Sequence, residues 1–130
     1  MTLPAHQIGP LRAATATQAA PFPQPGPACM AELDAYLNRI GYEGPREPTL
    51  EVLREVHRRH AFGIPYENLD VLRGREVSQD IEAIFDKVVN RERGGWCYEM
   101  NGLLGWALAG LGFEVTRQLG AVMRSERGDA

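Results

Sequence analysis

One cysteine stands in the most chemically suggestive run of this sequence. The run from Arg93 to Asn101 reads RGGWCYEMN and places Cys97 at the start of a predicted helix. A thiol attacks only as the thiolate, and the unpaired N–H groups at a helix N-terminus favour that form. Gly94 and Gly95 would permit a close backbone approach to the sulfur. Because a lone cysteine in an apolar helix is more often a small buried hydrophobe, the surrounding residues must decide whether Cys97 is a nucleophile.

Two polar residues that precede this run are predicted to support it. Glu67 and Asn68 follow Pro65 in a short loop. A partly buried carboxylate needs a paired cation. We therefore expect this loop to be anchored against the side chain of Arg91 or Arg93 rather than to take part in chemistry.

The helix that begins near Cys97 contains further candidates. Glu99 either tunes the thiol or complements the helix dipole, and the sequence favours neither role. Asn101 is predicted to hold the neighbouring loop by hydrogen bonds, and Trp96 and Trp106 are interpreted as packing groups. The backbone N–H of Cys97 is a candidate oxyanion donor, with its second donor unidentified.

Apolar spacing predicts the helices that position these residues. Apolar side chains recur three and four residues apart over 30–40, 50–61, 78–89 and 97–111. Thr49 and Ser78 are predicted to cap the second and third helices. Gly41 stands where the first helix should end, and Gly110 or Gly112 is expected to end the fourth. Cys97 is thereby placed in a first helical turn.

The two ends of the chain are predicted to differ from this helical middle. Residues 1–28 are rich in alanine and proline and are interpreted as a disordered leader, with Met30 as the functional start. Residues 113–123 alternate apolar and polar side chains, which predicts a strand. A lone strand is unstable and its free edge invites association, so self-association through it is a further hypothesis.

Composition excludes several classes of partner. The 14 basic residues against 17 acidic ones give a formal charge of −3, so neither nucleic acid nor a membrane surface is predicted as a partner. The two cysteines are too few and too far apart for a disulfide framework, which favours a cytoplasmic setting. No metal cofactor is predicted.

Two separated motifs resemble those of a known family. The run from Arg93 to Leu104 resembles the active-site signature of the arylamine N-acetyltransferases, and Ile64 to Asp70 (IPYENLD) resembles their second hallmark, with Tyr66 where phenylalanine is more usual. The resemblance covers roughly residues 30–124. It implies an α+β, cysteine-proteinase-like fold, present here mainly as the N-terminal helical bundle plus the first strands of the β-barrel domain that follows. The implied domains are the leader, a bundle at 29–112 that carries the nucleophile, and a truncated barrel domain at 113–130.

The resemblance also implies an activity. A triad of Cys, His and Asp would take an acetyl group from acetyl-CoA and pass it to an arylamine, arylhydroxylamine or hydrazine by a ping-pong mechanism. By its motif position Cys97 would be the nucleophile. The residues that would bind acetyl-CoA are not identified.

The other two triad residues do not carry over. All three histidines precede Cys97: His6 lies in the leader, while His57 and His60 lie near the end of the second helix, where a cation suits the helix dipole. Asp129 has no histidine near it to orient. This chain alone is therefore expected to be weakly active or inactive.

Three other functions compete with this interpretation. A truncated remnant would keep the bundle without catalysis and act at most as an interaction module. A related amide synthase would accept its acyl group from a carrier protein, and no residue of the chain separates it from the acetyltransferase. A thiol protease is disfavoured because the run around Cys97 lacks the signature of such enzymes.

Overall fold

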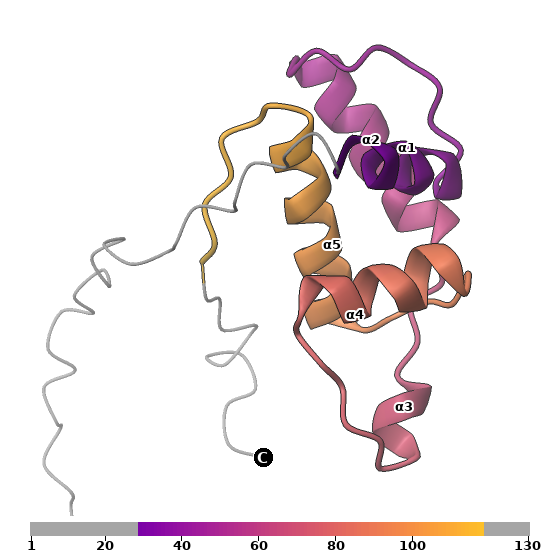
Figure 1. Cartoon of the computed structure of the whole chain (residues 1–130). Helices are drawn as coiled ribbons and strands as arrows, with labels where there is room; N and C mark the ends of the chain where they lie inside the picture. Colours follow the sequence, from indigo (N-terminus) through magenta and orange to yellow (C-terminus); the bar gives the residue numbers. More distant parts are fainter. Residues whose placement is uncertain (1–28, 119–130) are drawn as a thin grey trace, which may run out of the picture. The chain divides into compact units, whose positions relative to one another are not determined.

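The computed structural model describes residues 29–118 of the chain. Its helices, coloured along the sequence in Figure 1, are α1 (Cys29–Arg39), α2 (Leu50–Gly63), α3 (Leu69–Leu72), α4 (Ile81–Phe85), the π-helical turn η1 (Asp86–Asn90) and α5 (Cys97–Gly110). The described residues as far as Val115 belong to one compact unit. Within 29–118 the only extended pairing is an isolated parallel bridge between Tyr66 and Gly95.

Helix α1 forms and ends as its sequence predicts. Four apolar residues at helical spacing are all buried: Leu33, Tyr36, Leu37 and Ile40. The helix closes with a pair of backbone hydrogen bonds, Gly41 N to Asn38 O at 3.0 Å and Tyr42 N to Leu37 O at 2.8 Å. This pairing requires a left-handed residue, and Gly41 takes it with φ of 68°.

Helix α2 begins at the predicted cap. The Thr49 hydroxyl accepts a hydrogen bond from the backbone N–H of Val52 at 3.3 Å, which satisfies one of the donors that the first turn leaves unpaired. The helix runs two residues beyond the predicted end at 61, to Gly63. Val52, Val56 and His60 form its buried face.

The third predicted helix begins later than expected and changes its winding. Ser78 is not the cap: its hydroxyl accepts from the N–H of Asp80, and the helix begins at Ile81. After Phe85 the chain passes from α4 into the wider turn η1. The predicted apolar face is present, because Ile84, Val88 and Val89 are buried and Ile81 and Phe85 pack against the core.

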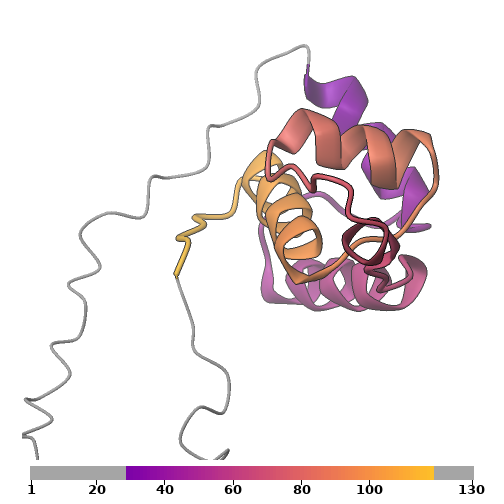
Figure 2. The same ribbon diagram turned by 90° about the horizontal axis from the view of Figure 1, so that it is seen from below.

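Helix α5 is the central apolar helix. It packs against α1, α2 and α4, and Figure 2 shows the same arrangement from below. Leu103 is fully buried at its middle, and burial of such a side chain contributes roughly 1.5–3 kcal/mol. Of the two glycines predicted to end it, the structure uses Gly112, whose φ of 95° allows Phe113 N to bond Leu108 O at 3.0 Å.

The predicted strand at 113–123 is not present in its described part. Residues 113–118 carry no regular structure, and 119–123 lie outside the described residues, as does the predicted leader. An extended segment needs a neighbouring strand to pair its backbone groups, and none is available within 29–118. Self-association through this strand stays a prediction.

The prediction that His60 is a cation that interacts with the dipole of its helix is wrong. Its ring is only 4% exposed, packs beside Tyr36, and shares a 2.8 Å hydrogen bond between Nδ1 and the Tyr36 hydroxyl. Burial lowers the pKa of His60 to about 4, although the Met100 backbone opposes the shift. The side chain is therefore neutral at pH 7 and serves the core, not the helix dipole. His57 stays at the exposed surface.

This buried histidine predicts a loss of stability in mild acid. The unfolded chain binds the proton first, because the pKa of His60 falls from 6.5 to about 4 on folding. The free energy of unfolding should thus drop by about 2–3 kcal/mol as pH falls from 6.5 to 4. Urea unfolding across this range measures it. His60→Asn should remove the drop, His57→Asn should keep it, and an unchanged slope in His60→Asn would contradict the assignment.

Candidate active site

Cys97 is the first residue of α5, and its thiol is exposed and free. The first N–H groups of a helix have no partner within the helix. The N–H of Cys97 instead donates to the Tyr66 hydroxyl at 3.2 Å. The sulfur thus lies at the N-terminal end of α5 and is open to a reactant from solvent.

The loop before Cys97 lies tightly against the segment around Tyr66. Gly95 N donates to Pro65 O at 3.2 Å, and Glu67 N donates to Gly95 O at 3.0 Å. A Cβ on Gly94 would lie 1.9 Å from the Pro65 carbonyl oxygen, closer than any real contact. The glycine at this position is therefore required by the approach of two backbones, and the approach sets where Cys97 begins its helix.

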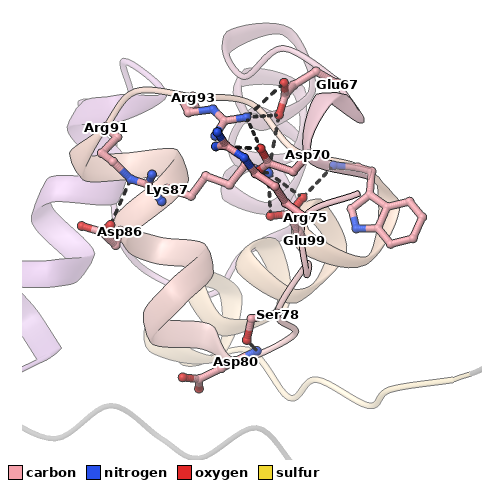
Figure 3. Close-up of polar contacts among 11 residues, drawn as sticks. Glu67, Asp70, Arg75, Ser78, Asp80, Asp86, Lys87, Arg91, Arg93 and Glu99 are labelled. Carbon is pink, nitrogen blue, oxygen red and sulfur yellow. Dashed lines mark hydrogen bonds and ion pairs between the residues drawn. The ribbon is translucent and has the colours of Figure 1, made fainter. Parts of the chain in front are cut away.

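A buried lysine lies beneath this junction. Lys87, in η1, is 5% exposed, and its ammonium contacts three carboxylates in Figure 3: Glu99 at 3.0 and 3.1 Å, Asp70 at 3.0 Å and Glu67 at 3.5 Å. These groups come from α5, α3 and the loop before α3. One cation thus ties the nucleophile's helix to the segment that carries Tyr66.

Two arginines, Arg39 and Arg93, hold the loop that leads to Cys97. Arg93 Nη2 lies 3.3 Å from Glu67 Oε1 and 3.2 Å from Asp70 Oδ1. Figure 3 shows Arg93 beside these two carboxylates. Arg39 donates to the backbone carbonyls of Val88 at 2.9 Å and of Glu92 at 3.3 Å. The loop between η1 and Cys97 is therefore fixed by charge-assisted hydrogen bonds at several points.

The charges of this cluster stabilise one another. Hydrogen bonds from Lys87 and Arg93 lower the pKa of Asp70 to about 2, against the smaller opposing effect of burial. Burial acts to lower the pKa of Lys87, but the hydrogen bonds and charges of Asp70 and Glu99 outweigh it and raise that pKa. Asp70 and Lys87 are therefore ionised at neutral pH.

The residues predicted to support the site take different places. Of the two arginines proposed for Glu67, the structure selects Arg93, while Arg91 pairs with Asp86 at 3.0 Å on the surface. Asn68 precedes α3 as its N-cap but forms no side-chain capping bond. Asn101 is exposed, and no hydrogen bond from its side chain to another described residue is found, so its role in holding the loop stays a prediction.

Glu99 and the tryptophans also have clear positions. Glu99, 3% exposed, accepts from the backbone N–H of Trp96 at 3.2 Å and binds Lys87, so its carboxylate caps α5 and points into the ion cluster. Trp106 is buried and packs edge-to-face on Tyr36, which is the predicted packing role. Trp96 is half-buried and packs against Tyr98 with ring centroids 5.1 Å apart.

Two members of the cluster were missed by sequence reasoning. On an ideal α-helix Lys87 would lie on the polar face. Asp70 is the last residue of the motif from Ile64 to Asp70, and the sequence shows no evident cation to pair with it. A lysine directly before the apolar pair Val88 and Val89 was the available signal. The structure buries it because the π-helical turn η1 places Lys87, Val88 and Val89 together on the inner face.

Neither described histidine is hydrogen bonded to Cys97. His60 is hydrogen bonded to Tyr36 in the core, and His57, the other described histidine, is exposed.

The described residues contain no group of three or more side chains able to hold a metal ion. Between 29 and 118 no helix is long and apolar enough to cross a membrane. A hollow bordered by Tyr42, Pro45 and Val52 does not include Cys97.

Comparison with known proteins assigns the class. The family model described as N-acetyltransferase matches residues 49–130, more than half of the chain and including Cys97. The chain belongs to this N-acetyltransferase family, and its curated relatives are arylamine N-acetyltransferases. The relative from Mycolicibacterium smegmatis is 48% identical over 100 residues, which is 76% of this chain and 36% of that protein. Arylamine N-acetyltransferase 1 of Oryctolagus cuniculus is 45% identical over 95 residues, 72% of this chain and 33% of that protein.

Solved structures agree with this assignment. The arylamine N-acetyltransferase of Nocardia farcinica matches with a TM-score of 0.60 and 52% identity, over 62% of this chain and 28% of that one. The Salmonella typhimurium enzyme matches with a TM-score of 0.63 and 43% identity, over 65% and 31%. The Mycobacterium marinum enzyme, solved in complex with CoA, matches with a TM-score of 0.59 and 52% identity, over 62% and 30%.

These matches confirm the family and the part of the fold that is present. The described helices correspond to part of the cysteine-protease-like fold of these enzymes. The chain spans about a third of the length of the curated relatives it matches. The β part of the predicted α+β fold does not occur within residues 29–118.

Proposed function

We propose that this chain is the nucleophile-bearing part of an arylamine N-acetyltransferase. In it Cys97 accepts an acetyl group from acetyl-CoA and passes the group to a small arylamine or hydrazine. The observation that carries the proposal is the free, exposed thiol at the start of α5 in a chain of this family. CoA in the Mycobacterium marinum enzyme supports the choice of donor. A free thiol also suits a reducing, cytoplasmic setting.

The proposed reaction has two half-reactions. The Cys97 thiolate attacks the thioester carbonyl, a carbon–sulfur bond forms, and CoA leaves as its thiolate. The amine nitrogen then attacks the acetyl-cysteine, loses a proton, and releases Cys97 when the second tetrahedral intermediate collapses. The chain supplies the free thiol at the start of α5 and the ion cluster that fixes the start of this helix.

The base for this reaction is proposed to come from outside the described residues. Cys97 has no hydrogen bond from His57 or His60, and a general base must be within hydrogen-bond reach of the proton it takes. We propose that the His and Asp partners lie in the part of the fold that the relatives have beyond the matched region. A barrel domain that begins after residue 112 would supply them, and this chain alone would be weakly active or inactive.

A chimera tests the proposed function. The chain is fused in frame to the segment that follows the matched region in the Mycolicibacterium smegmatis relative, and acetylation of an aromatic amine by acetyl-CoA is measured. The chimera should turn over at least about 100-fold faster than the chain alone, because base catalysis contributes about that factor. Cys97→Ser should abolish the gain. A chimera whose turnover survives Cys97→Ser would show that another group carries the acetyl.

A further inference from the structure

The hydroxyl of Tyr66 contacts the backbone amide of the proposed nucleophile. The N–H of Cys97 donates to the Tyr66 oxygen at 3.2 Å. The backbone of Tyr66 is fixed beside the nucleophile's loop, since it forms the parallel bridge with Gly95 whose two hydrogen bonds flank it. The backbone from which this side chain extends is therefore set by the loop junction, and the hydrogen bond from Cys97 holds the hydroxyl at its other end.

The hydroxyl still has its own hydrogen to give. It accepts from Cys97, and within residues 29–118 no hydrogen bond in which it donates is found. Tyr66 is 68% exposed, and the Cys97 thiol is exposed as well. The neighbouring N–H of Trp96 is already bound by Glu99 and cannot serve a reactant. The Tyr66 O–H is thus a free donor beside the sulfur.

We propose that Tyr66 is a catalytic residue whose hydroxyl binds the oxyanion formed when Cys97 is acylated. The inference rests on the proposed function. When the thiolate attacks the acyl carbonyl, the carbon–sulfur bond forms and the carbonyl π pair moves onto oxygen. The Tyr66 O–H donates to that oxygen without losing its proton. As the pair returns, the leaving group departs and the acyl-cysteine remains.

The contact with Cys97 strengthens this donor. A hydroxyl that accepts a hydrogen bond is polarised and donates a stronger one, so the Cys97 N–H acts on the oxyanion through the Tyr66 oxygen. A fixed donor aimed at developing charge is the usual device for stabilising such intermediates. The competing interpretation is that the hydroxyl merely occupies the amide and must leave before the oxyanion can bind. The two interpretations predict opposite effects of removing the hydroxyl.

The test compares two reactions of the same sulfur. Acylation by p-nitrophenyl acetate places negative charge on a carbonyl oxygen, whereas alkylation by iodoacetamide displaces iodide at a saturated carbon and forms no oxyanion. Both rates are measured on the 130-residue chain at one pH, with the modified Cys97 peptide followed by mass spectrometry. Tyr66→Phe removes only the hydroxyl. Tyr98→Phe is the matched control, because Tyr98 is 52% exposed and adjacent to Cys97 but does not bond its amide.

In Tyr66→Phe the acylation rate should fall about 10-fold or more, while alkylation should stay within about twofold. Tyr98→Phe should change neither rate. Equal losses of both rates would mean that Tyr66 only positions the sulfur, and unchanged or faster acylation would mean that it blocks the amide; either result overturns the proposal. Failure of the acetyltransferase function is a separate result, because any accessible thiolate attacks the nitrophenyl ester even if acetyl-CoA is not a substrate.

Discussion

Replacing Lys87 by methionine is expected to destabilise the fold by about 3–5 kcal/mol at neutral pH. The methionine keeps the apolar stem but removes the cation that contacts Glu99, Asp70 and Glu67. Arg93 alone cannot pair three carboxylates, and it does not contact Glu99, which is 3% exposed. A buried carboxylate left without its partner bears the full cost of desolvation. Urea unfolding of the purified variant measures the loss.

Two comparisons isolate the cause of this loss. Arg91→Met removes a pair whose side chains are 56% and 55% exposed, so it should cost less than about 1 kcal/mol. Adding Glu99→Gln to Lys87→Met should recover about 1 kcal/mol or more, since the orphaned charge is removed. The cost of Lys87→Met should also shrink as pH falls toward about 2, where Asp70 takes up its proton in the parent protein as well. A loss that is equal in both single variants and indifferent to pH would contradict the role given to the buried cluster.

Gly94→Ala is the second change with a large expected effect. Its new Cβ would lie 1.9 Å from the Pro65 carbonyl oxygen and 2.8 Å from the Pro65 carbonyl carbon, and backbone atoms cannot move aside as a side chain can. Separating the two segments would break the hydrogen bonds of the bridge at Gly95. We expect a loss of about 2–4 kcal/mol from overpacking and lost hydrogen bonds together.

Gly102→Ala is the matched control for that change. Gly102 lies inside α5, and its added Cβ would meet only Ile84 Cδ1 at 3.5 Å, an ordinary contact. Because alanine is the better helix former by about 1 kcal/mol, this variant should be neutral or more stable. Thermal and urea unfolding of both variants give the comparison. If Gly94→Ala proved as stable as Gly102→Ala, the close approach of the two loops would not be a constraint on the site.

The helices could be predicted because their signals are local. Apolar spacing identified the buried faces of α1 and α5. Thr49 caps α2 because its hydroxyl accepts a backbone hydrogen bond, and Gly41 ends α1 because glycine tolerates a positive φ. Ser78 failed as a cap because two residues more of extended chain precede α4, so its hydroxyl reaches only the N–H of Asp80. A helix boundary depends on which nearby backbone N–H a capping side chain bonds, and the spacing of apolar residues does not show this.

The ion cluster could not be predicted because it depends on tertiary contacts. Lys87 is buried only through the π-helical turn, and its partner Asp70 lies on a short helix, α3, which has no buried residue to mark it. The Tyr66 hydroxyl meets Cys97 across 31 positions of sequence. The family motifs identified these segments, but only the folded chain brings Glu67, Asp70, Lys87, Arg93 and Glu99 together.

Locating the acetyl group tests most directly whether Cys97 carries it. The chimera with the relative's downstream segment is incubated with labelled acetyl-CoA without an amine and analysed by peptide mass spectrometry. The label should lie on Cys97 as a thioester that hydroxylamine removes, and an aromatic amine added before digestion should remove it as the N-acetyl product. Label confined to lysines, or an unlabelled Cys97 while the amine is still acetylated, would contradict the account.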